Sequence, residues 1–522
     1  MSNRQTLQAA GQLPGRPAHK GWGVSIARNS VLTVTGQFVP AAAALVSMPV
    51  LARHLGHDRL GLLTLLWIAI GYFSLLDLGM SVAVTRAVAQ VVAIGDDHRV
   101  PHIFWSGVFS QLTMGVLGAI VLAAASPYAV GPFLHIPKAL SGEARSALMI
   151  GAMGIPFSMA SYSTIGLLQA VQRFDITTRI QAPLGAAQYL LAALCSLWRP
   201  NLALIVLILV AARCAGLVLL YNAARRLFPV LHRSMKFHRK EFASLFKFGG
   251  WITVTSVISP MQVYADRFVI GGVLSLSAVA YYSVPLDASL RILVIPCTLM
   301  IAAFPTLSAA RPCDLEAVIA LAAKLVRWMF FILAVPITAG IIFSADIMRF
   351  WMGPVFAAQS APVLSILLVG ILANSFARVP LSVLNAAGRP DVAAKLQLAE
   401  FPVQIAATVL LLHVYGLPGA ALAWTSRLLV DTALLFIIAK RATGLRLCDV
   451  LGVRLRAGMG GLALMGLATA AAAQMTKTPS LKLASALALV LTGFLGAWSC
   501  CLTSRDRRGL LEEMSRITGS WR

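Results

Sequence analysis

The sequence predicts an all-α polytopic membrane protein with about 14 transmembrane helices, and its composition, its apolar runs and its loop charges all indicate this class. The set AVILMFWYC supplies 58% of the residues, charged residues only 12%, and the mean hydropathy is +0.81. Soluble domains carry about 25% charged residues, so this chain has too little charge for a water-exposed surface. Since the helices use about 280 of the 522 residues, a large soluble catalytic domain is excluded.

Apolar runs nearly free of charge locate the individual helices. A helix rises about 1.5 Å per residue, so roughly 20 apolar residues cross the hydrocarbon core. Prolines such as Pro260 and Pro296 predict kinks in the seventh and eighth helices. The expected spans are 29–52, 60–82, 103–126, 147–169, 181–198, 202–222, 249–273, 279–305, 325–345, 361–384, 398–415, 417–438, 457–476 and 482–502.

The loops between these spans differ in charge. One alternating set holds about 27 Lys and Arg residues and the other about 7, and the positive-inside rule places the richer set and both termini in the cytoplasm. The net charge of +24 is therefore interpreted as orientation charge, with no nucleic-acid partner. Residues 1–28 lack an apolar segment, which argues against a cleavable signal peptide.

The longest basic loop, residues 225–248, divides the spans into six and eight. Its second part sets Phe242, Leu245 and Phe246 at helical spacing, so we expect an amphipathic helix beneath the headgroups. Small residues five apart follow both the first and the seventh span, which indicates a parallel repeat of two bundles. The expected organisation is a basic tail at 1–28, a six-helix lobe at 29–224, the linker at 225–248, a second six-helix lobe at 249–438, two additional helices with their basic loop at 439–502, and a cytoplasmic tail at 503–522.

Ionisable side chains far from the span ends indicate function, because each costs at least about 2.5 to 3.5 kcal/mol in hydrocarbon. Such groups normally face a protein interior or a water-filled cavity. Asp287 and Arg291 are four residues apart, as are Arg427 and Asp431. Each pair is expected to meet on one helix face and to cancel much of its charge.

The remaining buried charges leave an excess of cations. Arg213 has no partner within one helical turn, and Arg267 has to share the adjacent Asp266. A positive cavity favours an anionic ligand, since arginine binds phosphate oxygens in a bidentate manner and stays protonated; an exporter of cations would favour the opposite sign. The predicted substrate-binding residues of the cavity and its inner rim are Arg86, Arg213, Arg267, Arg291, Arg378 and Arg427, and the candidates for coupling or ion pairing are Asp77, Asp266, Asp287 and Asp431.

Motifs of other chemistries do not occur in this sequence. It has no GxxxxGK[ST] loop, no HExxH, no GxSxG and no CxxC pair, so we expect no ATPase site, no metal site and no cofactor. The predicted outer loops are short, and the largest contains Lys138, Glu143 and Arg145. A membrane enzyme normally needs a larger loop for its chemistry, so we do not expect an enzyme.

Two regions resemble a known family. The first runs from Asn29 to Gln90 through Leu51-Ala-Arg-His-Leu-Gly, Tyr72-Phe-Ser-Leu-Leu-Asp-Leu-Gly-Met and Val84-Thr-Arg-Ala-Val-Ala. The second includes Phe248-Gly-Gly-Trp, Ala265-Asp-Arg-Phe-Val-Ile-Gly, Val279-Ala-Tyr-Tyr-Ser-Val and Phe304-Pro-Thr-Leu-Ser. Both resemble the polysaccharide or O-antigen flippases of the multidrug/oligosaccharidyl-lipid/polysaccharide exporter superfamily.

The resemblance implies two pseudo-symmetric lobes around a central cationic cavity. It also implies a multi-pass flippase of the bacterial inner membrane that moves polyprenyl-diphosphate-linked oligosaccharide by alternating access, for O-antigen or exopolysaccharide synthesis. Membrane lipids, a polysaccharide polymerase and export machinery are the expected partners. Asp77, Arg86, Asp266 and Arg267 fall on family motifs.

Two alternatives stay open at this stage. One is a cation-coupled exporter of small molecules or drugs from the same superfamily, although the uncharged span 29–52 argues against sodium coupling through that helix. The other is a membrane polysaccharide polymerase or ligase. It would need catalytic groups in the outer loops, for which Lys138, Glu143, Arg145 and Arg349 are the candidates.

Overall fold

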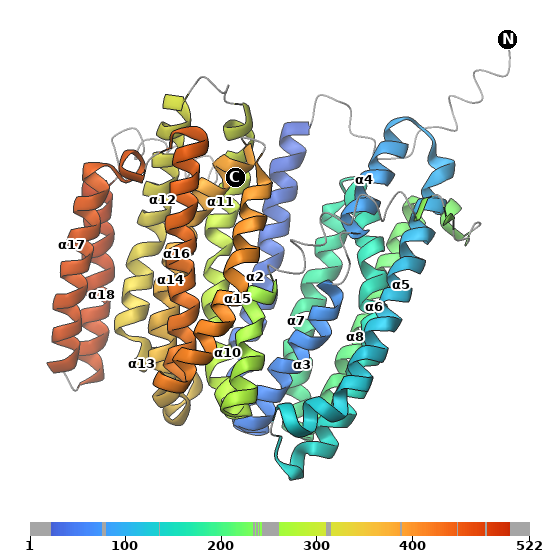
Figure 1. Ribbon diagram of the computed structural model, residues 1–522, viewed down its shortest axis with the longest axis horizontal. Coiled ribbons are helices and arrows are strands. Elements are labelled where there is room, and N and C mark those ends of the chain that lie inside the picture. Colours follow the sequence, from blue (N-terminus) through green and yellow to red (C-terminus); the bar gives the residue numbers. More distant parts are fainter. Residues whose placement is uncertain are drawn as a thin grey trace. The chain divides into compact units, whose positions relative to one another are not determined.

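The chain is helical throughout the part that the computed structural model describes, which confirms the predicted all-α class (Figure 1). Eleven helices of this part are long and apolar enough to cross a membrane, and two shorter apolar helices, Met80–Val92 and Ala484–Ser499, accompany them. Contacts divide the chain into two compact units, Met1–Pro260 and Met261–Arg522. The described residues are 22–75, 80–134, 136–232, 235, 238–239, 241–242, 260–309, 315–386, 389–445, 447–475 and 478–501.

The first unit is built around α6, which packs against α3, α4, α5 and α8, while α2 lies along α7. The approach of α5 to α6 depends on Gly115, because a Cβ there would lie 2.6 Å from the Cα of Pro156. The elements of this unit are α2 (Trp22–Leu55), α3 (His57–Leu75), α4 (Met80–Ala93), η2 (Asp97–Arg99), α5 (Val100–Tyr128), η3 (Ala129–Phe133), α6 (Lys138–Ala170), α7 (Phe174–Trp198), α8 (Leu202–Leu227) and η4 (Pro229–His232).

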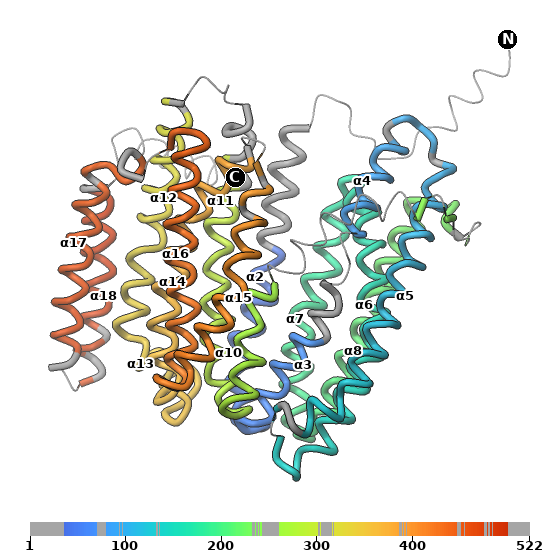
Figure 2. Tube along the Cα trace, in the orientation of Figure 1, coloured from blue at the N-terminus to red at the C-terminus, as the bar shows by residue number. Residues whose placement is uncertain are grey.

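The second unit has α14 at its centre, packed against α10, α11, α12, α13 and α16. α15 packs against α16, and α17 and α18 pack against α12 (Figure 2). The elements of this unit are a helical segment over residues 260–273, then α10 (Leu276–Ile292), α11 (Val294–Ala309), α12 (Leu315–Ile342), α13 (Ser344–Met352), α14 (Pro354–Ala386), α15 (Pro390–Tyr415), α16 (Leu417–Thr443), α17 (Leu447–Met475), α18 (Pro479–Gly496) and η5 (Ala497–Cys501).

A tight turn joins α15 to α16. Gly416 has a φ of +62°, in the left-handed region that favours glycine. Gly419 lies so close to the carbonyl group of Leu411 that no Cβ fits between them. These two glycines allow α16 to return directly along α15.

Two expected spans are divided in the structure. The span 279–305 is interrupted at Leu293, because Pro296 has no amide hydrogen to donate to the carbonyl group of residue 292. The span 325–345 ends at Ile342, and the short helix α13 follows separately.

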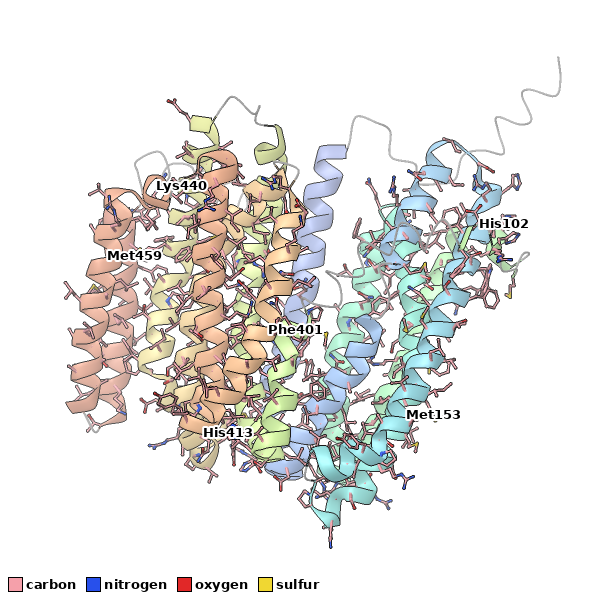
Figure 3. The ribbon with its side chains drawn as sticks, viewed as in Figure 1. His102, Met153, Phe401, His413, Lys440 and Met459 are labelled. Atoms are coloured by element: carbon pink, nitrogen blue, oxygen red, sulfur yellow. The ribbon has the colours of Figure 1, made fainter. Side chains whose placement is uncertain are left out.

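Apolar side chains fill each unit and also cover much of the outside. Val84, Phe104 and Leu168 belong to the core of the first unit, and Val326 and Phe330 to that of the second. A surface in contact with lipid is apolar as well, which explains the many exposed aliphatic side chains. Those more than half exposed include Val46, Met153, Leu219, Leu410 and Leu464, of which Met153 is labelled in Figure 3.

Candidate functional site

Asp266 and Arg267 are adjacent in the helical segment 260–273, and their side chains meet different partners because successive helical residues point about 100° apart. Asp266 is fully buried. Its carboxylate accepts hydrogen bonds from the hydroxyl of Tyr282 on α10 at 3.2 Å, the amide of Gln404 at 3.1 Å and the hydroxyl of Thr408 at 3.1 Å, both on α15. The negative charge is therefore solvated by three donors of the protein.

Arg267 is only 1% exposed, and its guanidinium group forms a two-point ion pair with Asp287 of α10. The Nη1 and Nη2 atoms lie 3.3 and 2.5 Å from the two carboxylate oxygens. The guanidinium also lies 5.2 Å from the centre of the Tyr264 ring. The expected sharing with Asp266 is wrong, because Asp266 already has three neutral donors and Arg267 reaches across to α10.

A chain of amide hydrogen bonds ties the segment 260–273 to α15. Gln404 Nε2 donates to the carbonyl group of Gln262 at 2.8 Å, and Gln262 Nε2 donates to the carbonyl group of Gln397 at 3.0 Å. Hydrogen bonds between buried polar groups stabilise a fold only when every group keeps its partner. The bonds around Asp266 thus fix the angle between these two helices.

A second charged cluster lies where α14, α15 and α16 meet. Arg427 Nη1 donates to Glu400 Oε2 at 3.5 Å, and the two side chains are 11% and 9% exposed. Arg378 donates to the amide oxygen of Asn374 at 3.3 Å, and Asp431 lies within the electrostatic reach of both arginines.

Arg427 and Asp431 lie within electrostatic reach of each other but form no direct ion pair in the described part of the chain. Arginine side chains on a helix point towards its N-terminus, which directs Arg427 away from Asp431. An acid that precedes its base by four residues is the favourable order, and Arg427 precedes Asp431. The guanidinium group bonds to Glu400 of the neighbouring helix instead.

The mid-depth charges of the second unit balance within its described residues. Three arginines (Arg267, Arg291 and Arg427) are matched in number by three carboxylates (Asp266, Asp287 and Asp431), and nearer the expected inner face Arg378 is matched by Glu400. An excess of positive charge at this depth, as the sequence predicts for the whole chain, does not arise in this unit.

Arg213 in the first unit has a different environment. It lies on α8, is half-buried, and its Nη1 donates to the hydroxyl of Ser158 on α6 at 2.8 Å. Among the residues that the structure describes, no carboxylate lies within 4.0 Å of Arg213, and Ser158 is its hydrogen-bonded partner. The other guanidinium hydrogens remain available to an acceptor from outside the protein.

The remaining predicted residues occupy varied positions. Arg86 is exposed on α4, and Arg291 is half-buried on α10. Asp77 lies outside the described residues. Of the predicted residues, the structure therefore brings Arg267 together with Asp287 in one cluster. Arg378, Arg427 and Asp431 lie together in a second cluster. Arg86 and Arg213 belong to the first unit.

Glu400, Gln404 and Thr408 complete both clusters, and the sequence analysis did not assign them to the site. Their signal is a spacing of four residues along α15, which places all three on one helix face. A polar stripe within an apolar span is a sign of buried partners, and these residues bond to Arg427 and Asp266.

The outer-loop candidates for an enzyme do not form a cluster of reactive groups in the described part of the chain. Glu143 Oε2 accepts from Arg59 at 3.0 and 3.1 Å, and its other oxygen accepts from the backbone amide of Leu202 at 2.5 Å. Lys138, Arg145 and Arg349 are exposed. The described residues also contain no group of three or more His, Cys, Asp or Glu residues placed to hold a metal ion.

Comparison with known proteins places this arrangement in context. A family model described as "Polysaccharide biosynthesis protein" matches residues 26–310. A Shigella flexneri protein named "Putative O-antigen transporter" is 28% identical over 414 residues, which cover 79% of this chain and 97% of that protein.

Solved structures share the fold at low identity. The lipid II flippase MurJ in an inward closed conformation has a TM-score of 0.68 at 14% identity, covering 89% of this chain and 98% of that one. An inward-facing multidrug resistance transporter of the MATE family has a TM-score of 0.61 at 13% identity, covering 80% and 98%. At these identities the likeness concerns the fold, which is that of multi-pass membrane transporters.

Proposed function

Because the chain belongs to the polysaccharide biosynthesis protein family, a family of membrane transporters, we propose that it flips polyprenyl-diphosphate-linked oligosaccharide across the bacterial inner membrane. The transported lipid would supply O-antigen or exopolysaccharide synthesis. The observation that supports this substrate class is Arg213, a cation at the middle of α8 whose described protein partner is a neutral hydroxyl. A diphosphate offers the oxygens that the unused guanidinium hydrogens require.

The proposed mechanism is alternating access with cationic groups that receive the diphosphate. Arg213 is the principal ligand, and the exposed Arg86 attracts the headgroup at the rim. The other proposed substrate-binding arginines belong to charge-balanced clusters of the second unit; they are Arg267, Arg291, Arg378 and Arg427. The polyprenyl chain stays in the lipid, since each CH₂ removed from an apolar environment costs about 0.8 kcal/mol.

The buried carboxylates supply the proposed coupling. Protonation of Asp266, Asp287 or Asp431 would release a cationic or neutral donor and change the packing of the helices that it joins. Asp287 is the best placed of these, since its side chain is 29% exposed and thus accessible to water while it holds a buried arginine. Membrane orientation with both termini in the cytoplasm is part of the same proposal, together with the domain boundaries expected from the sequence.

A complementation experiment tests the proposal. Arg213→Gln, Arg267→Gln and Arg427→Gln are introduced singly into a strain that lacks the gene, with Arg226→Gln at the exposed end of α8 as the matched control. We expect Arg213→Gln to reduce surface polysaccharide at least about tenfold and to accumulate the polyprenyl-linked intermediate, as loss of a charge-assisted bond of about 1.5 to 3 kcal/mol implies. Normal polymer in all three variants, at normal protein level, would refute the cationic cavity.

The drug-exporter alternative makes the opposite prediction. It requires resistance to a cationic drug on overexpression, and the same strains test it directly. Resistance without any effect on surface polysaccharide would favour the alternative.

A further inference from the structure

The chain that follows α8 does not leave the first unit at the end of that helix. Phe228 and Leu231 are buried in the core of this unit, and the indole nitrogen of Trp105 donates to the carbonyl group of Leu231 at 2.7 Å. Phe242 packs against the same core. The described residues between 229 and 242 therefore form a docked segment on the N-terminal part of α5, and we call it the docked linker.

Polar contacts hold the far end of the docked linker. The backbone amide of His238 donates to Ser106 Oγ at 3.0 Å, and Arg99 Nη2 lies 2.6 Å from Glu241 Oε1. Glu241 raises the pKa of the Arg99 guanidinium above its usual range, by its hydrogen bond first and by its charge second. Arg99 therefore stays charged at any physiological pH.

The same interface contains two stacked imidazole rings. The rings of His102, on α5, and His238, on the docked linker, have their centroids 3.9 Å apart at an angle of 26° (His102 is labelled in Figure 3). Neutral imidazoles stack favourably in this geometry. Two imidazolium ions at this separation would repel each other, and histidine is the side chain that gains its charge between about pH 8 and 5.

We propose that the His102–His238 stack is a pH-sensitive latch, which keeps the docked linker on α5 while at most one ring is charged and releases it when both are protonated. Burial, the neighbouring ring of His238 and the charge of Arg99 oppose a charge on His102, whereas Glu241, itself paired with Arg99, and Asp96 favour it.

The consequence concerns the packing of the first unit. Release would free the described residues of the docked linker, Leu231 and Phe242 among them, from the core that they cover, independently of which substrate is carried.

Hydrogen–deuterium exchange of the full-length protein in lipid nanodiscs tests the latch. We expect the amides of the described residues between 229 and 242 to exchange at least about tenfold faster at pH 5.5 than at pH 8, after correction for intrinsic rates, because two charged rings with centroids 3.9 Å apart repel each other and open the contact. The variant His238→Phe keeps an aromatic ring without a charge and should exchange slowly at both values. His98→Gln, on the exposed η2 beside α5, is the matched control and should behave as wild type.

A second measurement separates the latch from general loosening of the fold. Ser106→Ala removes the acceptor of the His238 amide and should raise exchange in residues 229–242 at both pH values, while α6 stays protected. Exchange of 229–242 that is independent of pH in wild type would overturn the proposal. So would a pH response in His238→Phe as large as that of wild type.

Discussion

The ion pair of Arg267 and Asp287 gives the sharpest prediction about stability. Asp287→Ala removes the carboxylate and leaves a guanidinium group that is only 1% exposed and whose Nε already has no partner. Removing one partner of a buried ion pair costs about 3 to 5 kcal/mol. Because the Asp287 side chain is 29% exposed, water can partly replace it, and we expect a loss near the lower limit, about 3 kcal/mol.

A double-mutant cycle measures this loss. The free energy of unfolding of the purified protein is followed by denaturant titration in mixed micelles for Asp287→Ala, and for a cycle of Asp287→Leu, Arg267→Met and the double variant Arg267→Met/Asp287→Leu. The double variant replaces both charges by apolar groups and should lie within about 1 kcal/mol of wild type. Lys395→Ala, which breaks an exposed pair on α15, is the control and should have no measurable effect.

The reasoning fails in either of two cases. If the Asp287→Ala variant were as stable as wild type, Arg267 would not be a buried, fully charged group. A double variant as unstable as the single one would mean that packing, and not the unpaired charge, causes the loss.

Three further predictions follow from other contacts. Thr408→Val removes one of the three donors to the buried Asp266 and should destabilise the second unit by about 1 to 3 kcal/mol, whereas Thr408→Ser should not; equal stability of both variants in the same titration would contradict this. Glu143→Gln should weaken the contact of α3 with α6 and raise hydrogen exchange at the N-terminus of α8, because Glu143 bonds to both Arg59 and the amide of Leu202. Unchanged exchange at Leu202 to Leu204 would contradict this role of Glu143. Gly419→Val should abolish folded protein in a solubilisation and size-exclusion assay, because the carbonyl group of Leu411 leaves no room for a Cβ, and a normal elution profile would contradict the turn.

Several span ends follow directly from the sequence. The helices α7, α8 and α16 end within a few residues of the expected limits, since charges, glycine or proline border each apolar run. The breaks do not follow from hydropathy, because residues such as Leu293 are as apolar as their neighbours. Only the position of Pro296 predicts the start of a new helix there.

The arginines of the charged clusters were predictable, but their partners were not. Hydropathy gives the depth of Arg267 and Arg427 along a span, whereas the partner depends on which helix lies beside it and in which direction the side chain points. The sequence therefore suggested partners on the same helix or next in sequence, and the structure pairs these arginines with Asp287 and Glu400 on neighbouring helices. The resemblance to the polysaccharide exporters, which depended on backbone motifs, is confirmed by the family match.

The balance of charge in the second unit changes what the net charge of +24 means for function. A buried arginine bonded to a carboxylate contributes little net attraction for an anion, while Arg213 donates to the neutral hydroxyl of Ser158 and has no carboxylate partner among the described residues. The proposed specificity for an anionic substrate therefore depends on one arginine more than on the number of arginines.

Transport by the purified protein in proteoliposomes measures this dependence most directly. A fluorescent polyprenyl-diphosphate-linked oligosaccharide is placed in both leaflets, and an impermeant quencher is added outside. The fluorescence of the inner-leaflet lipid falls as this lipid is flipped outward, and this fall is followed with time. The account predicts rapid flipping by wild type, at least about tenfold slower flipping by Arg213→Gln, and partial rescue by Arg213→Lys. Equal rates for wild type and Arg213→Gln, or no flipping of the diphosphate lipid by wild type, would contradict it.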